Sequence, residues 1–302
     1  MSQATSSSAR RQYGLARVCR VWKLPRSTVY HRRRQAAMPA QPKPLPRHRG
    51  PQGPCSDQEL LAHIRRVLRE SPFHGEGYRK VWAKLRFENI RTSRGRVRCL
   101  MREHGLQAPG RVGHAHGPKA HDGTIITSRP DIMWGTDLTT TVTTDEGTAH
   151  VFVAVDHCTC ECVGIHAAKG GNRFEALEPI RQAVRQFFGG FQEGVAVGLS
   201  VRHDHGSQYM ADDFQKELSF LGIESSPSFV REPQGNGCAE RFIRTLKENL
   251  LWVRHFRTVE ELRLALLEFQ RQYNHEWLIE RHHYKTPTAV RQSFTPSLES
   301  AA

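Results

Sequence analysis

Long apolar runs are absent from this 302-residue chain, and its N-terminus is polar. The apolar runs, of which Val151–Val155 is typical, are far shorter than the roughly 20 residues that span a bilayer. Met1–Ser8 lacks the apolar segment of a signal peptide. The sequence therefore argues against a membrane-spanning segment and a membrane partner, and it predicts a cytoplasmic protein.

Cysteine is scarce and unpaired. The chain has seven cysteines, an odd number, and no two are spaced as C-x-x-C, so a structural zinc site is not predicted. Cys158, Cys160 and Cys162 alternate and would face one side of a strand, where we interpret them as small buried hydrophobic residues. The histidines in the glycine-rich stretch 114–121 have no cysteine pair nearby, and we interpret them as linker residues.

Acidic residues are scarce in the first part of the chain. Residues 1–129 hold 27 Lys and Arg against 7 Asp and Glu, a net charge of +20. Residues 130–302 hold 17 against 23, a net charge of −6, which leaves +14 for the whole chain. A cationic front half joined to a mildly acidic back half favours nucleic acid as the partner. A solvated basic surface is the alternative. A patch for anionic membranes is less favoured, because no basic amphipathic helix has an aromatic face.

Residues 1–34 are interpreted as an N-terminal helix-turn-helix. Apolar residues recur with helical spacing between Ala9 and Trp22, Lys23–Pro25 interrupts the pattern, and a second, polar helix ends in arginines. The candidate DNA contacts on this second helix are Ser27, Thr28, Arg32 and Arg33. A small helical hairpin with a basic end is the alternative interpretation.

A second helix-turn-helix is predicted over residues 57–107. It follows a proline-rich basic linker over 35–56 and precedes a linker over 108–129 that is rich in Gly, His and Pro. The expected helices are Asp57–Glu70, Gly77–Phe87 and Ser93–His104. The third helix is basic, and its candidate DNA contacts are Arg94, Arg96 and Arg98.

Beyond the second linker the periodicity changes from helical to strand-like, which predicts a third domain over 130–292 with a C-terminal helix, followed by a tail over 293–302. The strand-like segments are Ile132–Thr143, Ala149–Asp156, Cys160–Ala167 and Ala196–Asp204. The helix-like segments are Asn172–Phe188, Asp212–Leu221, Gly237–Leu251 and Val259–Tyr273. Three successive strands and then strand–helix alternation indicate an α/β fold with a mixed sheet, preceded by small all-α modules.

Three acidic residues lie where catalytic chemistry would need them. Asp137 lies in the first predicted strand, Asp204 ends the fourth, and Glu240 follows in a helix after a gap of 35 residues. Spacing alone is weak evidence because acidic residues are common, so the neighbours carry the specificity. Gly206 leaves room for DNA beside Asp204. Asn236 lies one helical turn before Glu240, which places its amide on the same face.

Polar and cationic residues near these acids are candidate DNA contacts. Arg244 and Lys247 follow Glu240 by four and seven residues, so they share its helix face and could hold phosphates, although a solvated face is the alternative. The full set of candidate contacts near the acids is His205, Asn236, Arg241, Arg244 and Lys247. Asp156 also ends a predicted strand, but the residues after it are typical of a hairpin turn. For each acid the alternative is a strand-end cap or a surface charge.

The segment from Trp134 to Val290 resembles the integrase catalytic core of bacterial insertion-sequence transposases of the OrfB type, which are encoded in a second, overlapping reading frame. The matching stretches are Arg202–Tyr209, Gly235–Gly237 leading to Glu240–Phe242, Tyr273–Glu276 and Tyr284–Pro287. Residues 57–107 resemble the helix-turn-helix segment that precedes this core. His203 and Trp277–Ile279 differ from the commoner pattern and leave the subgroup open.

The resemblance implies a ribonuclease H-like core and the activity of a DDE transposase or integrase. Asp137, Asp204 and Glu240 would be the catalytic, metal-binding residues for two Mg²⁺ ions, with Mn²⁺ as a substitute. The implied reaction is cleavage at the element ends, followed by attack of the freed 3′-hydroxyl on target DNA. No covalent protein–DNA intermediate is implied, so no Ser or Tyr nucleophile is needed.

The partners that the resemblance implies are DNA, as terminal repeats and as target, and further copies of the chain assembled on it. An upstream-frame partner or fusion protein is also implied, and the protein would be associated with the nucleoid when bound. Two other functions stay open at this point. One is a ribonuclease H-like nuclease that cuts without joining, and the other is a non-catalytic DNA-binding regulator.

Overall fold

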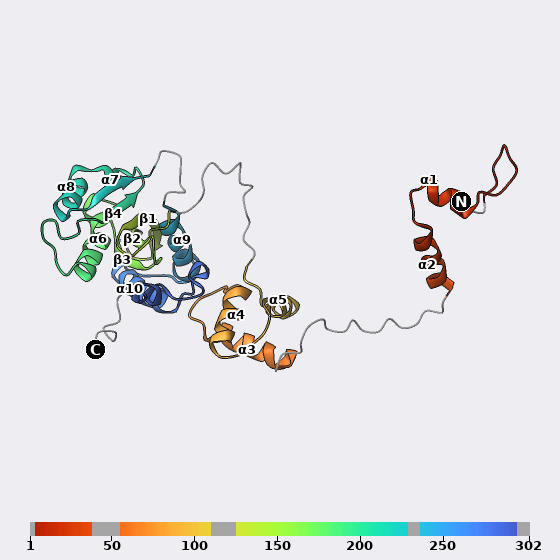
Figure 1. Ribbon diagram of the computed structural model, residues 1–302. Coiled ribbons are helices and arrows are strands. Elements are labelled where there is room, and N and C mark those ends of the chain that lie inside the picture. The colour runs from red at the N-terminus through yellow and green to blue at the C-terminus, as the bar shows by residue number, and fades with distance from the viewer. Residues whose placement is uncertain (1–3, 38–54, 110–124, 229–235, 295–302) are drawn as a thin grey trace, which may run out of the picture. The chain divides into compact units, whose positions relative to one another are not determined.

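The computed structural model describes residues 4–37, 55–109, 125–228 and 236–294 (Figure 1). The chain divides into two compact units, Met1–Gln52 and Gly53–Ala302. In the described ranges no helix is long and apolar enough to cross a membrane. Most of the two predicted linkers lies outside the described residues, as do the histidines of 114–121 and Gly235 of the motif before Glu240.

The first unit contains two helices, α1 (Leu15–Val21) and α2 (Arg26–Ala37). The first helix is shorter than predicted, because Arg10 adopts a left-handed backbone conformation and the chain pairs Thr5 with Gln12 before the helix begins. The break over Lys23–Pro25 is confirmed, with Lys23 also left-handed. Among the described residues of this unit only Cys19 is buried, so the two helices enclose very little core.

The second unit begins with three helices, α3 (Asp57–Glu70), α4 (Tyr78–Phe87) and α5 (Arg94–Glu103), as predicted. Ser56 and Glu59 form a capping box at the start of α3, which satisfies two backbone N–H groups that the helix leaves unpaired. Gly105 follows α5 in the left-handed conformation that favours glycine at a helix end. The three helices enclose a small core of their own, formed by Leu60, Ile64, Val67, Val81, Leu85, Val97, Leu100 and Met101.

A five-stranded mixed sheet forms the centre of the second unit, with the strand order β3-β2-β1-β4-β5. β1 is antiparallel to β2, which is antiparallel to β3, whereas β1–β4 and β4–β5 are parallel. The strands are β1 (Met133–Thr143), β2 (Gly147–Asp156), β3 (Cys162–Ala168), β4 (Ser200–His203) and β5 (Glu224–Pro227). β1 therefore lies in the middle, where its residues can meet side chains from both neighbouring strands and both faces.

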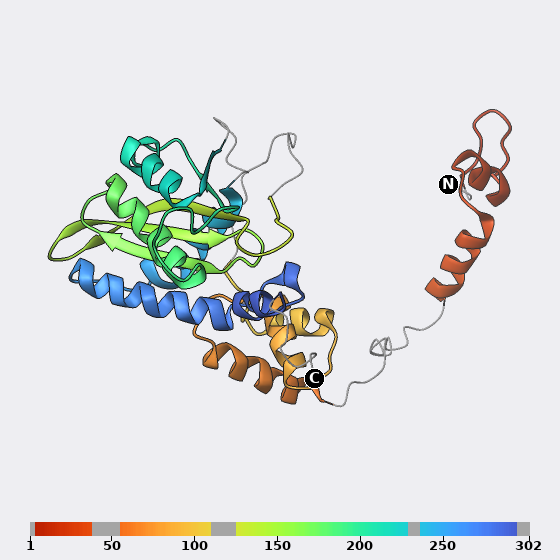
Figure 2. The ribbon, with the colours of Figure 1, turned by 60° about the vertical axis from the view of Figure 1, so that its left-hand side comes forward.

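Helices cover both faces of the sheet (Figure 2). On one face, alternate residues of β2 such as Phe152 and Ala154 pack with α6 and α8. On the other face, Val151, Val153 and Val155 pack with α9 and α10. This alternation follows from the two-residue period of a strand. The helices of the second unit after the sheet begins are α6 (Arg173–Phe187), α7 (Ser207–Met210), α8 (Asp212–Leu221), α9 (Gly237–Leu246), α10 (Val259–Glu276) and α11 (Pro287–Gln292).

Two predicted boundaries are wrong in informative ways. The fourth strand is only the four residues of β4, because Gly194 and Gly198 adopt positive φ and turn the chain before it, so Asp204 lies just beyond the strand. The helix predicted to run to Leu251 is regular only to Leu246 and continues as one π-helical turn, η2 (Lys247–Leu251). A π turn widens the helix by one residue and is often found beside functional residues.

The cysteine pattern also differs from its prediction. Cys158 and Cys160 lie in the turn between β2 and β3, with Cys160 in the left-handed conformation, and only Cys162 is in a strand. The three side chains therefore do not alternate along one strand. Their burial is confirmed, since none is more than 8% exposed, and all seven cysteines are free.

The three-helix module of α3–α5 is joined to the sheet domain by side-chain contacts. Phe73, between α3 and α4, belongs to the core cluster beneath α10 and contacts the rings of Phe269 and Trp277 edge to face. The backbone N–H of His74 donates to Oδ1 of Asn249 in η2, at 2.7 Å. Because these contacts are buried or partly buried, they tie the module to the end of the α9–η2 helix.

Candidate active site

Asp137 lies in the central strand β1, on the face that α9 covers. Its side chain is partly buried, and its Oδ1 accepts a hydrogen bond from the backbone N–H of Leu138 at 2.8 Å. Burial raises the pKa of this carboxyl to about 6, and the negative charges of Asp204 and Glu240 act in the same direction. The bond from Leu138 and the positive charge of Lys247 partly oppose the rise. Asp137 is thus a carboxylate that is costly to ionise in the free protein.

Asp204 follows β4 directly and is exposed. Its Oδ1 accepts a hydrogen bond from the backbone N–H of Gly206 at 2.8 Å, which turns the carboxylate back over the start of α7. A Cβ at position 206 would lie 2.9 Å from that oxygen, so glycine leaves the carboxylate room. β4 pairs with β1 in parallel, which brings Asp204 to the same end of the sheet as Asp137.

Glu240 lies in the first turn of α9 and is exposed. Burial of part of the carboxyl raises its pKa. The buried residues of α9 pack on the sheet and fix the position of the helix, and Glu240 in its first turn is near enough to Asp137 for its charge to raise the pKa of Asp137. The three predicted acids are therefore electrostatic neighbours that come from β1, the β4–α7 turn and α9.

The donor set of this cluster is three carboxylates, which is the ligand type that Mg²⁺ and Mn²⁺ prefer. Among the residues that the structure describes, no three His, Cys, Asp or Glu side chains are grouped tightly enough to hold a metal ion. Like charges repel, so carboxylates of this kind close around a cation rather than around one another. Burial raises the pKa of Asp137, and repulsion by Asp204 and Glu240 adds to the rise. The residues present thus fit a hard divalent cation by chemistry.

The predicted cationic contacts lie beside the acids. Lys247 is close enough to Asp137 to lower its pKa. Arg244 is exposed and forms a surface ion pair with Glu248 at 3.2 Å, one helical turn further on. Arg241 and His205 are exposed. Arg241 and Arg244 place positive charge along α9, Lys247 adds a charge at the start of η2, and the imidazole of His205 follows the exposed Asp204.

Asn236 is placed differently from its predicted neighbours. Its side chain is only 5% exposed, and its Nδ2 donates to the backbone carbonyl of Thr136, the residue before Asp137, at 2.9 Å. A direct contact with DNA is therefore left as a prediction, with the amide turned into the protein. Sequence reasoning also missed Tyr209, whose ring is fully buried and stacks on His203. Only the motif around Asp204 hinted at a role for it.

Asp156, the alternative acid, is a structural residue. Its Oδ1 accepts hydrogen bonds from the backbone N–H and the hydroxyl of Thr159, and its Oδ2 accepts from the backbone N–H of Asp131. The side chain is fully buried. It therefore caps the turn between β2 and β3, as its sequence context predicted.

The predicted DNA-contacting arginines of α5 partly interact with other residues of the protein. Arg96 donates to Asp57 Oδ1 and to the carbonyl of Cys55, both at 2.7 Å. The guanidinium of Arg94 lies 4.3 Å from the centre of the Trp82 ring, a cation–π contact. Arg98 is exposed, 5.8 Å from the centre of the Tyr78 ring. Of the three predicted contacts, Arg96 is the one most fully held by protein partners.

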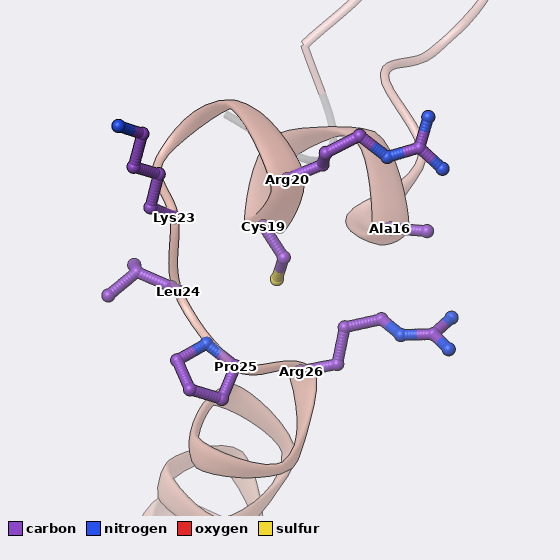
Figure 3. Close-up of a pocket in the computed structure, with 7 residues that line it drawn as sticks. All are labelled: Ala16, Cys19, Arg20, Lys23, Leu24, Pro25 and Arg26. Atoms are coloured by element: carbon purple, nitrogen blue, oxygen red, sulfur yellow. The ribbon is translucent and has the colours of Figure 1, made fainter.

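In the first unit, the predicted contacts of α2 are all on the surface: Ser27, Thr28, Arg32 and Arg33. A hollow between α1 and α2 is lined by Ala16, Cys19, Arg20, Lys23, Leu24, Pro25 and Arg26 (Figure 3). Three of these residues are cations, which the sequence interpretation did not single out. Cations around the helix–helix turn add to the positive surface that α2 carries.

Comparison with known proteins identifies two kinds of domain. Residues 127–233 and 221–287 each match a model of the integrase core domain, and residues 56–113 match an HTH-like domain. A similar curated protein is Transposase InsD for insertion element IS2A/D/F/H/I/K of Escherichia coli. It is 27% identical over 201 residues, which are 65% of this chain and 65% of that protein. The match thus spans just under two thirds of the relative's length.

Two of the similar solved structures are catalytic core domains of viral integrases. The catalytic core domain of BIV integrase is 18% identical, with a TM-score of 0.40, over 54% of this chain and 95% of that one. The HTLV-2 integrase catalytic core domain in complex with magnesium is 16% identical, with a TM-score of 0.40, over 54% and 98%. The sequence matches identify an integrase core domain and a preceding HTH-like domain, and the chain is homologous to the InsD transposases of bacterial insertion sequences.

Proposed function

We propose that this protein catalyses metal-dependent cleavage at the ends of an insertion sequence and transfer of the freed 3′-hydroxyl into target DNA. The observation that carries the proposal is the proximity of Asp204 and Glu240 to Asp137: burial raises the pKa of Asp137, and the negative charges of Asp204 and Glu240 raise it further. Three carboxylates from separate elements at one end of a sheet have no structural need to be there. They are instead what a hard divalent cation requires.

Asp137, Asp204 and Glu240 would hold Mg²⁺ or Mn²⁺. When bound, a pair of such ions activates the attacking oxygen of a phosphodiester displacement and stabilises the leaving oxygen. The chain's own contribution is to orient the acids. The backbone N–H of Leu138 donates to Asp137 Oδ1, and the backbone N–H of Gly206 donates to Asp204 Oδ1. Of these groups, Asp137 must lose its proton to serve as a ligand, which its pKa of about 6 permits at neutral pH.

DNA would be held by cations around this cluster. Arg241 and Arg244 present positive charge along α9, Lys247 does so at the start of η2, and His205 lies next to Asp204. The exposed residues of α2 and the basic helix α5 would bind further along the duplex, through phosphates and base edges. We propose terminal repeats and target DNA as the substrates, a homo-oligomer on DNA, and an upstream-frame protein as a further partner.

The test is a cleavage and joining assay with Mg²⁺ or Mn²⁺ on DNA that carries the flanking element ends, comparing the wild type with Glu240→Gln. We expect joined products from the wild type, and binding without cleavage or joining from the variant, because the substitution removes one ligand and keeps the side-chain volume. Nicks without joined products would indicate a nuclease. Binding without any metal-dependent cleavage, even after the upstream-frame protein is added, would indicate a regulator and would overturn the proposal.

A further inference from the structure

The start of α9 is fastened to β1 by one side-chain amide. Asn236 precedes the first residue of the helix, but its side chain makes no cap bond to the helix N-terminus. An Asn at this position ordinarily accepts from a backbone N–H two or three residues later. Here Nδ2 instead donates to the carbonyl of Thr136 in β1, at 2.9 Å, from a side chain that is 5% exposed. The amide therefore joins two elements rather than ending one.

Glycine at position 135 makes room for that amide. A Cβ built on Gly135 would lie 2.4 Å from Asn236 Oδ1 and 2.8 Å from His157 Nε2, closer than any side chain could tolerate. Gly135 and Asp137 are two residues apart on β1, so they face the same side of the sheet. Asn236 and His157 thus close over β1 at Gly135, two residues before Asp137 and on the same face.

His157 is the second side chain that packs closely against Gly135. It is fully buried in the turn between β2 and β3, and its Nδ1 lies 3.0 Å from the carbonyl of Ile125. A carbonyl only accepts, so Nδ1 carries the proton. Burial lowers the pKa of His157, which keeps the ring neutral and leaves Nε2 without one. The ring is therefore a fixed, uncharged surface against which the amide of Asn236 is placed.

We infer that Asn236 is a positioning residue that sets the separation between the strand of Asp137 and the helix of Glu240. This inference rests on the proposed function, because it concerns the geometry of the same acids. Asn236 lies four residues before Glu240, so one helical turn joins the amide clamp to the carboxylate. Its bonding partner, Thr136, is the residue before Asp137. This hydrogen bond thus links the start of the helix that carries Glu240 to the residue before Asp137.

The test compares Asn236→Ala and Asn236→Asp with a matched control, Asn274→Ala. Asn274 is also a buried asparagine that bonds backbone across elements, from α10 to the N–H and the carbonyl of Cys162, but away from the acids. For each protein we would measure the Mn²⁺ concentration that gives half of the metal-induced rise in melting temperature, and the affinity for element-end DNA without metal. Hydrogen exchange of the α9 amides would be followed in parallel.

We expect both Asn236 variants to need about tenfold more Mn²⁺, the usual effect of removing a group that orients a ligand. Asn236→Asp keeps the shape but loses the donor, so it should be no better than Asn236→Ala. Asn274→Ala should lower the melting temperature without moving the Mn²⁺ midpoint. An equal shift in the control, or an unchanged midpoint in both Asn236 variants, would overturn the inference. Unchanged metal response together with weaker DNA binding would make Asn236 a DNA contact instead.

Failure of the proposed function has a different signature. A wild type that binds Mn²⁺ but neither cuts nor joins DNA would refute the proposed reaction, and the midpoints would still decide on Asn236. If the wild type does not respond to Mn²⁺ at all, hydrogen exchange decides. Exchange of the hydrogen-bonded amides of α9 that is faster in Asn236→Ala than in Asn274→Ala supports the clamp, and equal exchange in the two variants overturns it.

Discussion

Replacing Asp137 by Asn should stabilise the metal-free protein at neutral and alkaline pH. The wild-type carboxyl is partly buried beside two other acids, so its charged form is unfavourable in the folded chain and not in the unfolded one. Asparagine has nearly the same shape and no charge to bury. The variant would therefore lose a proposed metal ligand and gain stability, which is the trade expected at an active site.

The magnitude follows from the pKa. In the unfolded chain Asp137 would ionise at its ordinary value of 3.8, and in the folded protein it ionises at about 6. The folded state thus holds the proton more tightly, so stability is lost as the pH rises from about 4 through 6 and the full penalty is present above 6. A difference of about 2 pH units corresponds to roughly 3 kcal/mol, and partial exposure to solvent reduces this to about 2 kcal/mol.

The assay is urea unfolding in EDTA at pH 4 and pH 8. We expect Asp137→Asn to raise the free energy of unfolding by about 2 kcal/mol at pH 8 and by little at pH 4. The control is Asp145→Asn, which breaks an exposed ion pair with Arg257 and should cost less than about 1 kcal/mol at either pH. A variant no more stable than the wild type at pH 8, or a gain that is the same at both pH values, would refute the electrostatic reasoning.

Three further predictions concern the fold and the basic front half. Arg291→Met should lower the free energy of unfolding, measured by chemical denaturation, by about 3 kcal/mol, because it leaves the carboxylates of Asp131 and the nearly buried Glu161 without their partner. The control is Arg271→Met, which removes an exposed ion pair and should lower the free energy of unfolding far less. Gly164→Ala should lower the melting temperature sharply, since its Cβ would lie 1.9 Å from the carbonyl oxygen of Pro179, whereas at Gly190 it meets nothing within 4 Å; equal effects would contradict this. Affinity for duplex DNA, measured by fluorescence anisotropy, should fall roughly 10³-fold between about 50 and 200 mM salt, and a flat response would argue against phosphate contacts.

Sequence periodicity was sufficient to predict the bounds of those elements whose structure depends on residues close together in the sequence. The capping box of Ser56 and Glu59 marks the start of α3, and the bounds of α8 match the predicted Asp212–Leu221. These features depend on residues within one or two turns of each other. β5 escaped prediction because its four residues, Glu-Ser-Ser-Pro, have little strand propensity and are held by pairing with β4.

The sequence was enough to select the three acids of the candidate site, but not to predict the hydrogen-bond partners of the polar side chains around them. Asp137, Asp204 and Glu240 come from three elements, and their proximity depends on β1 pairing with β4, across more than 60 residues of sequence. Amide and guanidinium groups are harder to place, because they take whichever partner the packing offers. Asn236 turns to Thr136, and Arg96 turns to Asp57. Neither partner is close in sequence, so no local sequence pattern predicts these hydrogen bonds.

The contacts between the three-helix module and the sheet domain limit how the protein can be re-engineered or can diverge. Phe73 fills space between Phe269 and Trp277, and Trp82 packs against Tyr284. If the three-helix module were replaced along its sequence boundaries alone, Phe73 and Trp82 would be removed and their aromatic partners in the sheet domain would be exposed. A portable unit for changing DNA specificity must therefore include the matching residues near the end of the core. In evolution, substitutions on the two sides of this contact between the module and the sheet domain should occur together.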